Sequence, residues 1–187
     1  MANLLTSIKS FFLKPAVEHI DVRFHSGSMK NNKNIQKDAN RLIMENFEDQ
    51  TPQGFYRFNH GFNNGNQPIF YISPKLDNTS AIAMICGSPF NLGSKTAMYL
   101  TYFVVDKKYR RQGYGALLLE SVMDYAKEQN IDYFVLTANE ISLPLFMSSL
   151  ILQEAVEGSN AYQILTQSWS KDIFEEIGDT VYLAKVN

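Results

Sequence analysis

The sequence lacks most of the features that would place it outside the ordinary globular proteins. It has one cysteine, Cys86, inside an apolar run, so it supports no disulfide framework and suits a reducing compartment. No apolar stretch approaches the roughly 20 residues of a transmembrane helix. The formal net charge of −2 is not the basic excess that is typical of a nucleic-acid binder. We therefore expect a cytoplasmic protein with no transmembrane segment and no nucleic-acid partner.

Length and composition fit one folded domain with an extension before it. The 187 residues are 45% hydrophobic and include 13 Phe and 10 Tyr. A chain of this size can bury roughly two thirds of its surface in a single core. No change of composition and no internal repeat divides residues 20–187, so we expect these residues to form the domain.

Residues 1–19 have the pattern of an amphipathic helix. Leu4, Leu5, Ile8, Phe11 and Phe12 recur at helical spacing. The segment lacks the basic start and the continuous apolar core of a signal peptide. Three interpretations remain open: a helix packed on the domain, which we favour, a partner-binding helix, and a weak membrane-surface anchor.

The rest of the chain alternates between strand and helix patterns. The expected strands are residues 20–24, 55–62, 69–72, 81–86, 96–105, 132–137, 162–165 and 180–186. The expected helices are residues 35–47, 117–129 and 143–150, with residues 167–178 partly helical. Residues 87–89 would end a strand, and residues 91–95 would be a loop. The polar face of the helix at residues 35–47, which includes Arg41, is typical of a solvated surface. Strands 96–105 and 132–137 flank a helix, so they should be parallel.

A glycine loop joins strand 96–105 to the helix that follows. Its sequence is Arg110-Arg111-Gln112-Gly113-Tyr114-Gly115, and Lys107 and Lys108 add to a local basic cluster. The first N–H groups of a helix have no partner within the helix, and the helix dipole adds positive potential. Glycine lets a phosphate approach the backbone closely. A strand, a basic glycine loop and a helix in this order therefore predict a phosphate site.

The loop differs from two common phosphate-binding motifs. No Lys-Ser or Lys-Thr follows its second glycine, as in a Walker A motif, and Leu118 replaces the third glycine of a dinucleotide fingerprint. It resembles instead the R/Q-x-x-G-x-G/A signature of the GNAT superfamily of acyl-CoA-dependent N-acyltransferases, with Arg110, Gly113 and Gly115 at the signature positions. The order of predicted elements also resembles that of the family over residues 20–186.

This resemblance implies an α/β (α+β) fold: a single GNAT-like domain with a mixed central sheet of about six to seven strands and flanking helices. It also implies acetyl-CoA as the acyl donor. In the family, the loop amides hold the CoA pyrophosphate, and the pantetheine arm lies where the two central parallel strands part. A backbone N–H near Val105 would donate to the thioester oxygen. Asn139 would hold the pantetheine region, although a strand-ending turn residue fits the same position. The implied cofactor-binding residues are Phe103, Val104, Val105, Arg110, Arg111, Gln112, Gly113, Tyr114, Gly115, Ala116, Asn139 and Phe146.

The proton-transfer residues of the family have no match in this chain. Many relatives carry a glutamate fourteen residues before the first loop glycine, where this chain has Tyr99, and residues 96–105 contain no carboxylate. Many also carry a tyrosine in the short helix, where Phe146 has no hydroxyl. The catalytic residues therefore stay unassigned, and proton loss to ordered water is a further option. The candidate bases are His25, His60, Glu140, Tyr99 and Tyr102.

Two functions of different classes follow from these expectations. The first is an N-acetyltransferase that transfers an acetyl group from acetyl-CoA to an amine of a small molecule or a protein, without a metal. The second is a catalytically weak or inactive GNAT-fold module that binds acyl-CoA as a sensor or an interaction partner. Tyr99 and Phe146 favour the second function, and the intact loop is compatible with both. An exposed final strand would allow a homodimer.

Overall fold

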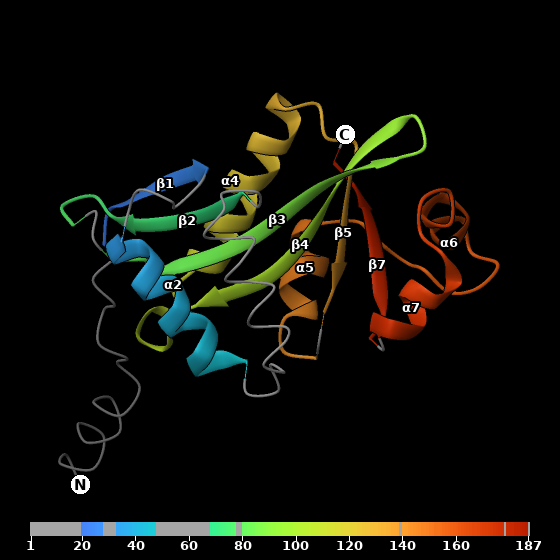
Figure 1. Cartoon of the computed structure of the whole chain (residues 1–187). Helices are drawn as coiled ribbons and strands as arrows, with labels where there is room; N and C mark the ends of the chain where they lie inside the picture. Colours follow the sequence, from blue (N-terminus) through green and yellow to red (C-terminus); the bar gives the residue numbers. More distant parts are fainter. Residues whose placement is uncertain are drawn as a thin grey trace, which may run out of the picture.

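One sheet contains all the strands of the computed structural model, which describes residues 20–27, 33–47, 68–77, 80–138, 140–177 and 179–186 (Figure 1). The sheet has seven strands in the order β1-β2-β3-β4-β5-β7-β6. The strands are β1 (Val22–Gly27), β2 (Ile69–Pro74), β3 (Ala83–Leu92), β4 (Lys95–Val105), β5 (Tyr133–Thr137), β6 (Leu152–Glu154) and β7 (Val181–Lys185). The helices are α2 (Lys33–Asn46), α4 (Tyr114–Glu128), α5 (Leu143–Ser149), α6 (Asn160–Leu165), α7 (Lys171–Ile177) and the 3₁₀ helix η1 (Lys107–Tyr109).

The sheet is mixed, as the sequence predicts. β4 and β5 run parallel, and the other neighbouring strands pair antiparallel. α4 connects β4 to β5, which confirms the predicted strand–helix–strand unit. This helix begins at Tyr114 rather than at residue 117.

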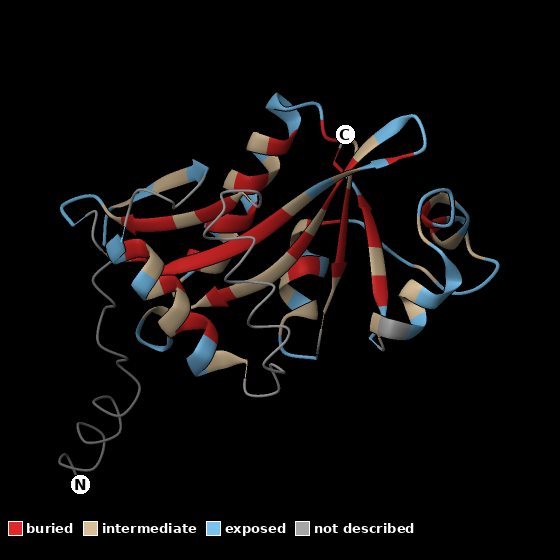
Figure 2. Cartoon of the chain, in the orientation of Figure 1, coloured by how far each residue is buried: buried red, intermediate tan, exposed pale blue. Residues whose placement is uncertain are grey.

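Alternate residues of β4 face two helical layers. Met98 and Leu100 belong to a core with α4 and α5, whereas Ala97 belongs to a core with α6 and α7. α2 packs over Met84 and Val104, also on the face opposite α4 but at the other end of the sheet from α6 and α7 (Figure 1). Figure 2 shows the buried residues along the strands and on the inner sides of these helices. The central strand β4 therefore takes part in every layer of the fold.

β4 is irregular near its end. Its register with β3 shifts between the Cys86–Thr101 pair and the Met84–Val104 pair, so two residues of β4 lie opposite one of β3. Tyr102, within this bulge, has a φ of 52°, which is uncommon for a residue with a side chain. Pairing with β5 stops before the bulge, at residue 100 of β4. The two parallel strands thus separate at their carboxyl ends, as expected for this fold.

The segment predicted as a strand at residues 162–165 is instead part of the helix α6. The Ser159 side chain accepts a hydrogen bond from the Tyr162 N–H at 3.1 Å and caps the helix. Ala161 and Leu165 are four residues apart and pack together on the sheet. The strand prediction was wrong because capping and packing decide the conformation of so short an apolar run.

β3 continues past the point where the sequence predicts a stop. It runs through residues 87–89 and forms a hairpin with β4, so only residues 93 and 94 of the predicted loop 91–95 form a turn. Proline is tolerated at strand edges because its missing N–H needs no partner there. β2 pairs with β3 only as far as Cys86, so Pro89 lies beyond the paired region, as far as the described strands show. The three-residue strand β6 has no counterpart among the predicted strands.

Some predicted features lie outside the described residues. These are the helix at residues 1–19, the strand at residues 55–62, His60 and Asn139. Among the helices that the structure describes, none is long and apolar enough to cross a membrane.

Candidate functional site

The loop between β4 and α4 turns sharply before the helix begins. The Asp106 side chain accepts a hydrogen bond from the Lys108 N–H at 3.0 Å and caps η1. Arg111 (φ 58°) and Gly113 (φ 86°) then adopt left-handed backbone conformations. Glycine does so without strain, and a Cβ added at Gly113 would meet no atom within 4 Å. The chain therefore enters α4 with open space beside Gly113.

The start of α4 fits an anionic ligand. Gly113 occupies the N-cap position and has no side chain that could cap the first-turn N–H groups. The helix dipole adds positive potential at this end. The side chains of Lys107, Lys108 and Arg111 are exposed around the loop. Backbone donors and three cations in this arrangement suit a phosphate group.

Arg110 has a different role from the other cations of the loop. Its Nε donates to the Val105 carbonyl at 3.0 Å, and its Nη2 donates to Oδ1 of Asn46. The Asn46 side chain in turn donates to the Leu42 carbonyl at 2.6 Å within α2. Arg110 therefore joins the end of β4 to the end of α2. Nothing in the sequence near Asn46 signals this contact.

A second link joins α2 to the loop. Arg41 donates from Nη2 to Oδ2 of Asp106 at 2.9 Å, and Asp106 is only 6% exposed. Burial by itself would raise the pKa of Asp106, but the hydrogen bonds from the Lys108 N–H and from Arg41 outweigh it and hold this pKa below its usual value. Arg41 is thus not the freely solvated side chain that the helix pattern indicates.

The side chains at the end of β4 divide between its two faces. The ring centroid of Phe103 lies 5.4 Å from that of Phe146, on the α4 side. A Cβ added at Gly115 would lie 3.4 Å from Phe103 and 3.2 Å from Leu145. Only glycine at this position leaves both neighbours undisturbed. Val104 is buried on the other face, under α2.

The side chains of the remaining loop residues contact other parts of the protein rather than the open space beside Gly113. Tyr114 is 3% exposed, and its hydroxyl accepts a hydrogen bond from the Ile20 N–H at 2.9 Å. Gln112 donates from its side chain to the Lys108 carbonyl at 2.9 Å. Ala116 is half-buried in the first turn of α4. The residues predicted to bind a cofactor therefore lie around the end of β4 and the start of α4, with Asn139 outside the described residues.

The candidate bases occupy separate places in the fold. The Tyr99 hydroxyl on β4 is hydrogen-bonded to the side chain of Thr137 on β5. Burial is the main cause that raises the pKa of Tyr99 and of Tyr102, so both stay protonated at neutral pH. His25 lies on β1, separated from β4 by two strands, and Glu140 lies in an exposed turn after β5. Among the candidates that the structure describes, Tyr99 lies just before the point where the central strands separate, and Tyr102 lies in the bulge just after it.

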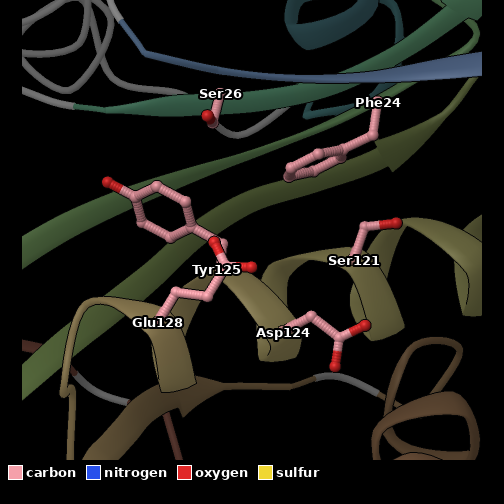
Figure 3. Close-up of a pocket in the computed structure, with 6 residues that line it drawn as sticks. All are labelled: Phe24, Ser26, Ser121, Asp124, Tyr125 and Glu128. Atoms are coloured by element: carbon pink, nitrogen blue, oxygen red, sulfur yellow. The ribbon is translucent and has the colours of Figure 1, made fainter.

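A surface hollow lies elsewhere, between β1 and the second half of α4 (Figure 3). Asp124 and Glu128 would repel a phosphate from it. Its lining residues are Phe24, Ser26, Ser121, Asp124, Tyr125 and Glu128. No group of three His, Cys, Asp or Glu side chains within the described ranges is placed to hold a metal ion.

Comparison with known proteins identifies the family and the fold. A model of the acetyltransferase (GNAT) family matches residues 34–149, more than half of the chain. No curated protein shows a significant match. Many solved structures share the fold, and three of them serve as examples. A GNAT-family acetyltransferase from Staphylococcus aureus Mu50 has 18% sequence identity and a TM-score of 0.59, and the match covers 89% of this chain and 100% of that one. Tetrahymena GCN5 has 13% identity and a TM-score of 0.66, with coverage of 88% of this chain and 96% of that one. A predicted acetyltransferase with acetyl-CoA from Clostridium acetobutylicum has 19% identity and a TM-score of 0.52, with coverage of 68% of this chain and 88% of that one. The family match is decisive, and the chain belongs to the GNAT family of acetyltransferases.

Proposed function

We propose that the protein is an N-acetyltransferase that transfers the acetyl group of acetyl-CoA to an amine of a small molecule or a protein. The observation that carries the proposal is the start of α4, where a left-handed Gly113 and exposed cations follow directly after β4. Family membership supports acetyl transfer in general, and the Clostridium acetobutylicum neighbour with acetyl-CoA supports this donor. The single buried thiol of Cys86 suits a reducing compartment such as the cytoplasm.

The loop has the space and the donors that the phosphates of CoA need. Gly113 leaves open space beside the first turn of α4, where a larger residue would be strained. The N–H groups of this turn, with Lys107, Lys108 and Arg111, would hold the phosphates. Acetyl-CoA supplies an activated acetyl thioester. Arg110 would hold the loop in place rather than contact the phosphates, because its guanidinium is bound to Val105 and Asn46.

The end of β4 would bind and orient the thioester arm. β4 continues to Val105 after its pairing with β5 has ended, so backbone groups on that side need other partners when a ligand buries them. A backbone N–H near Val105 would donate to the thioester oxygen as negative charge builds on it. Phe103 and Phe146 would exclude water from the α4 side of the arm.

A second candidate function is an acyl-CoA-binding module that does not turn its ligand over. The observation that favours it is the absence of a carboxylate on β4, where Tyr99 stands, together with Phe146 in place of a hydroxyl-bearing side chain. Transfer to an amine separates the two functions.

Thermal unfolding with and without acetyl-CoA tests the binding site. Acetyl-CoA at about a hundred times its Kd should stabilise the fold by about 2.7 kcal/mol. Gly113→Glu should abolish this shift because it places a carboxylate beside the phosphates. Gly158→Glu is a matched control, because Gly158 has a similar φ of 87° and open space but precedes α6. Equal shifts in both variants would contradict the proposed site.

A transfer assay then tests catalysis. We expect release of free CoA thiol, and an acetylated product by mass spectrometry, with at least one of spermidine, glucosamine and a lysine-containing peptide. Stabilisation by acetyl-CoA without any product from these amines would instead support the binding module.

A further inference from the structure

Two hydroxyl groups meet where β4 and β5 separate. The last paired residues of the two strands are Leu100 and Leu136, and Thr137 follows on β5. The Tyr99 hydroxyl is hydrogen-bonded to the Thr137 side chain across the strand boundary. Tyr99 packs with the core that contains α6 and α7, so the pair lies on the face opposite α4.

The ring of Tyr99 is held by packed aromatic neighbours. Trp169 meets it edge-on at a centroid distance of 5.7 Å. Trp169 also stacks on Phe90 of β3 at 5.7 Å and contacts Phe174 of α7 at 5.6 Å. Aromatic pairs at these distances are favourable. With Trp169 against the ring and Thr137 at the hydroxyl, the oxygen of Tyr99 has a defined position.

The charge near this hydroxyl is negative and comes from outside β4. After burial, which is the larger cause, the carboxylate of Asp179 also raises the pKa of Tyr99. Thr137 pairs with the first residue of β7, so Asp179, two residues earlier, lies beyond the end of β5. Glu154 and Glu175 line a hollow together with Asp179. An amine that approaches as a cation would be attracted to this side.

We propose that Tyr99 is the acceptor-side hydroxyl of the reaction: supported by Thr137, it hydrogen-bonds the attacking amine where β4 and β5 separate. The proposal rests on the proposed function. Tyr99 is half-buried rather than fully enclosed. Its position on β4 lies just before the backbone that would face the thioester.

Tyr99 orients the amine but does not take its proton. The phenol stays neutral at neutral pH, and its oxygen can accept a hydrogen bond from the amine N–H. In the transfer, a bond forms between the amine nitrogen and the acetyl carbon, and the carbon–sulfur bond breaks. The nitrogen releases one proton to water, and the departing thiolate takes up one. The rate should therefore follow the unprotonated fraction of the acceptor amine.

The first test removes only the hydroxyl. With an amine that the wild type acetylates, Tyr99→Phe should lower kcat/KM for the amine by about 10- to 100-fold, the loss of one hydrogen bond to a charged or reacting group. The Kd of acetyl-CoA should not change. Tyr133→Phe is the matched control, because Tyr133 packs in the same core but lies at the other end of β5. It should keep the wild-type rate.

The outcomes separate the inference from the function on which it rests. If the wild type acetylates none of spermidine, glucosamine and a lysine-containing peptide, the proposed function fails and the inference fails with it. If the wild type is active and Tyr99→Phe matches Tyr133→Phe, only the inference is overturned. A weaker affinity of Tyr99→Phe for acetyl-CoA would also overturn the inference, because the Tyr99 hydroxyl would then contribute to binding acetyl-CoA rather than the amine.

The pH profile tests whether Tyr99 orients the amine, as proposed, or instead takes its proton. In the wild type, kcat/KM should rise with pH toward the pKa of the amine, and the midpoint should differ between two accepted amines of different pKa. Tyr99→Phe should lower the profile without moving its midpoint. A midpoint that is the same for both amines would assign the titration to a base on the protein and would overturn the inference.

Discussion

Asp106 shows how a single side chain can fix the loop that precedes α4. One of its oxygens accepts from the Lys108 N–H at 3.0 Å, and the other accepts from Arg41 at 2.9 Å. A carboxylate that is only 6% exposed needs such partners to remain charged. The folded protein therefore stabilises the ionised carboxylate of Asp106 relative to its protonated form.

We expect this residue to make the fold sensitive to acid. The folded-state pKa of Asp106 is lowered because its hydrogen bonds and the charge of Arg41 outweigh burial. The stabilisation is therefore complete above the unfolded-state pKa of about 3.9 and is lost as the pH falls through the folded-state pKa. Asp106→Asn should lower the free energy of unfolding by roughly 1–3 kcal/mol at neutral pH, and the difference from wild type should shrink in acid. Urea unfolding between about pH 7 and pH 2 measures both effects.

Asp124→Asn is the control for this prediction. The Asp124 carboxylate is 76% exposed and lies 3.8 Å from Lys127, so its loss should change the free energy of unfolding by less than about 1 kcal/mol. An equal acid dependence in wild type and Asp106→Asn would show that Asp106 does not bind its partners as described.

At the scale of elements, α2 is linked to the loop at two points along its length. Arg41 in its middle binds Asp106, and Asn46 at its end binds Arg110. The same guanidinium reaches the Val105 carbonyl, so one side chain connects β4, the loop and α2. Lysine carries the same charge but lacks the planar fork that makes both contacts.

A double-mutant cycle tests this link. Arg110→Lys and Asn46→Ala should each lower the free energy of unfolding by about 0.5–1.5 kcal/mol, and together they should cost hardly more than one alone. Arg110→Lys with Ser121→Ala is the control pair, because the Ser121 hydroxyl donates within α4 to the Leu117 carbonyl. That pair should be additive. Additive costs for Arg110 with Asn46, measured by urea unfolding, would show that the two side chains do not act together.

The elements that were predicted correctly have strong local signals. The strand before the glycine loop is apolar and β-branched, the loop carries its glycines in order, and the helix after it has a clear apolar face, so β4, the turn and α4 follow from neighbouring residues. Short elements were harder. α6 was mistaken for a strand because its six residues hold too little periodicity. β3 was predicted too short because Gly87, Ser88 and Pro89 are typical of a strand end, whereas Pro89 is tolerated within β3 since it lies beyond the region paired with β2.

The candidate site was predicted only where it is local. The residues around Gly113 were found because they are contiguous in sequence. Asn46 and Thr137 were missed because their partners, Arg110 and Tyr99, lie 64 and 38 positions away and nothing in the local sequence marks the contact. Such contacts follow from the strand order and the placement of α2, which local patterns do not determine.

At the scale of the whole molecule, three packed groups of side chains share the central strands. β4 contributes Leu100 to the core under α4, Val104 to the core under α2 and Ala97 to the core under α6 and α7. Phe134 and Val135 of β5 likewise point to opposite faces. If one helical layer separates from the sheet, it exposes apolar residues of the central strands. The same strands also carry the cores under the other helices, so those cores are disturbed as well. We therefore expect the described part of the fold to unfold as one cooperative unit.

The single tryptophan makes this expectation measurable. Trp169 lies on the α6 and α7 side, so its fluorescence reports that layer, whereas far-UV circular dichroism reports the whole fold. Leu119→Ala, in the fully buried α4 core on the opposite face, should lower the free energy of unfolding by about 2–5 kcal/mol and move both urea transitions together. Leu117→Ala, at a site 40% exposed on the same helix, should stay within about 0.5 kcal/mol of wild type. A fluorescence transition that Leu119→Ala leaves unmoved while the circular dichroism transition shifts would mean that α6 and α7 unfold separately from the sheet.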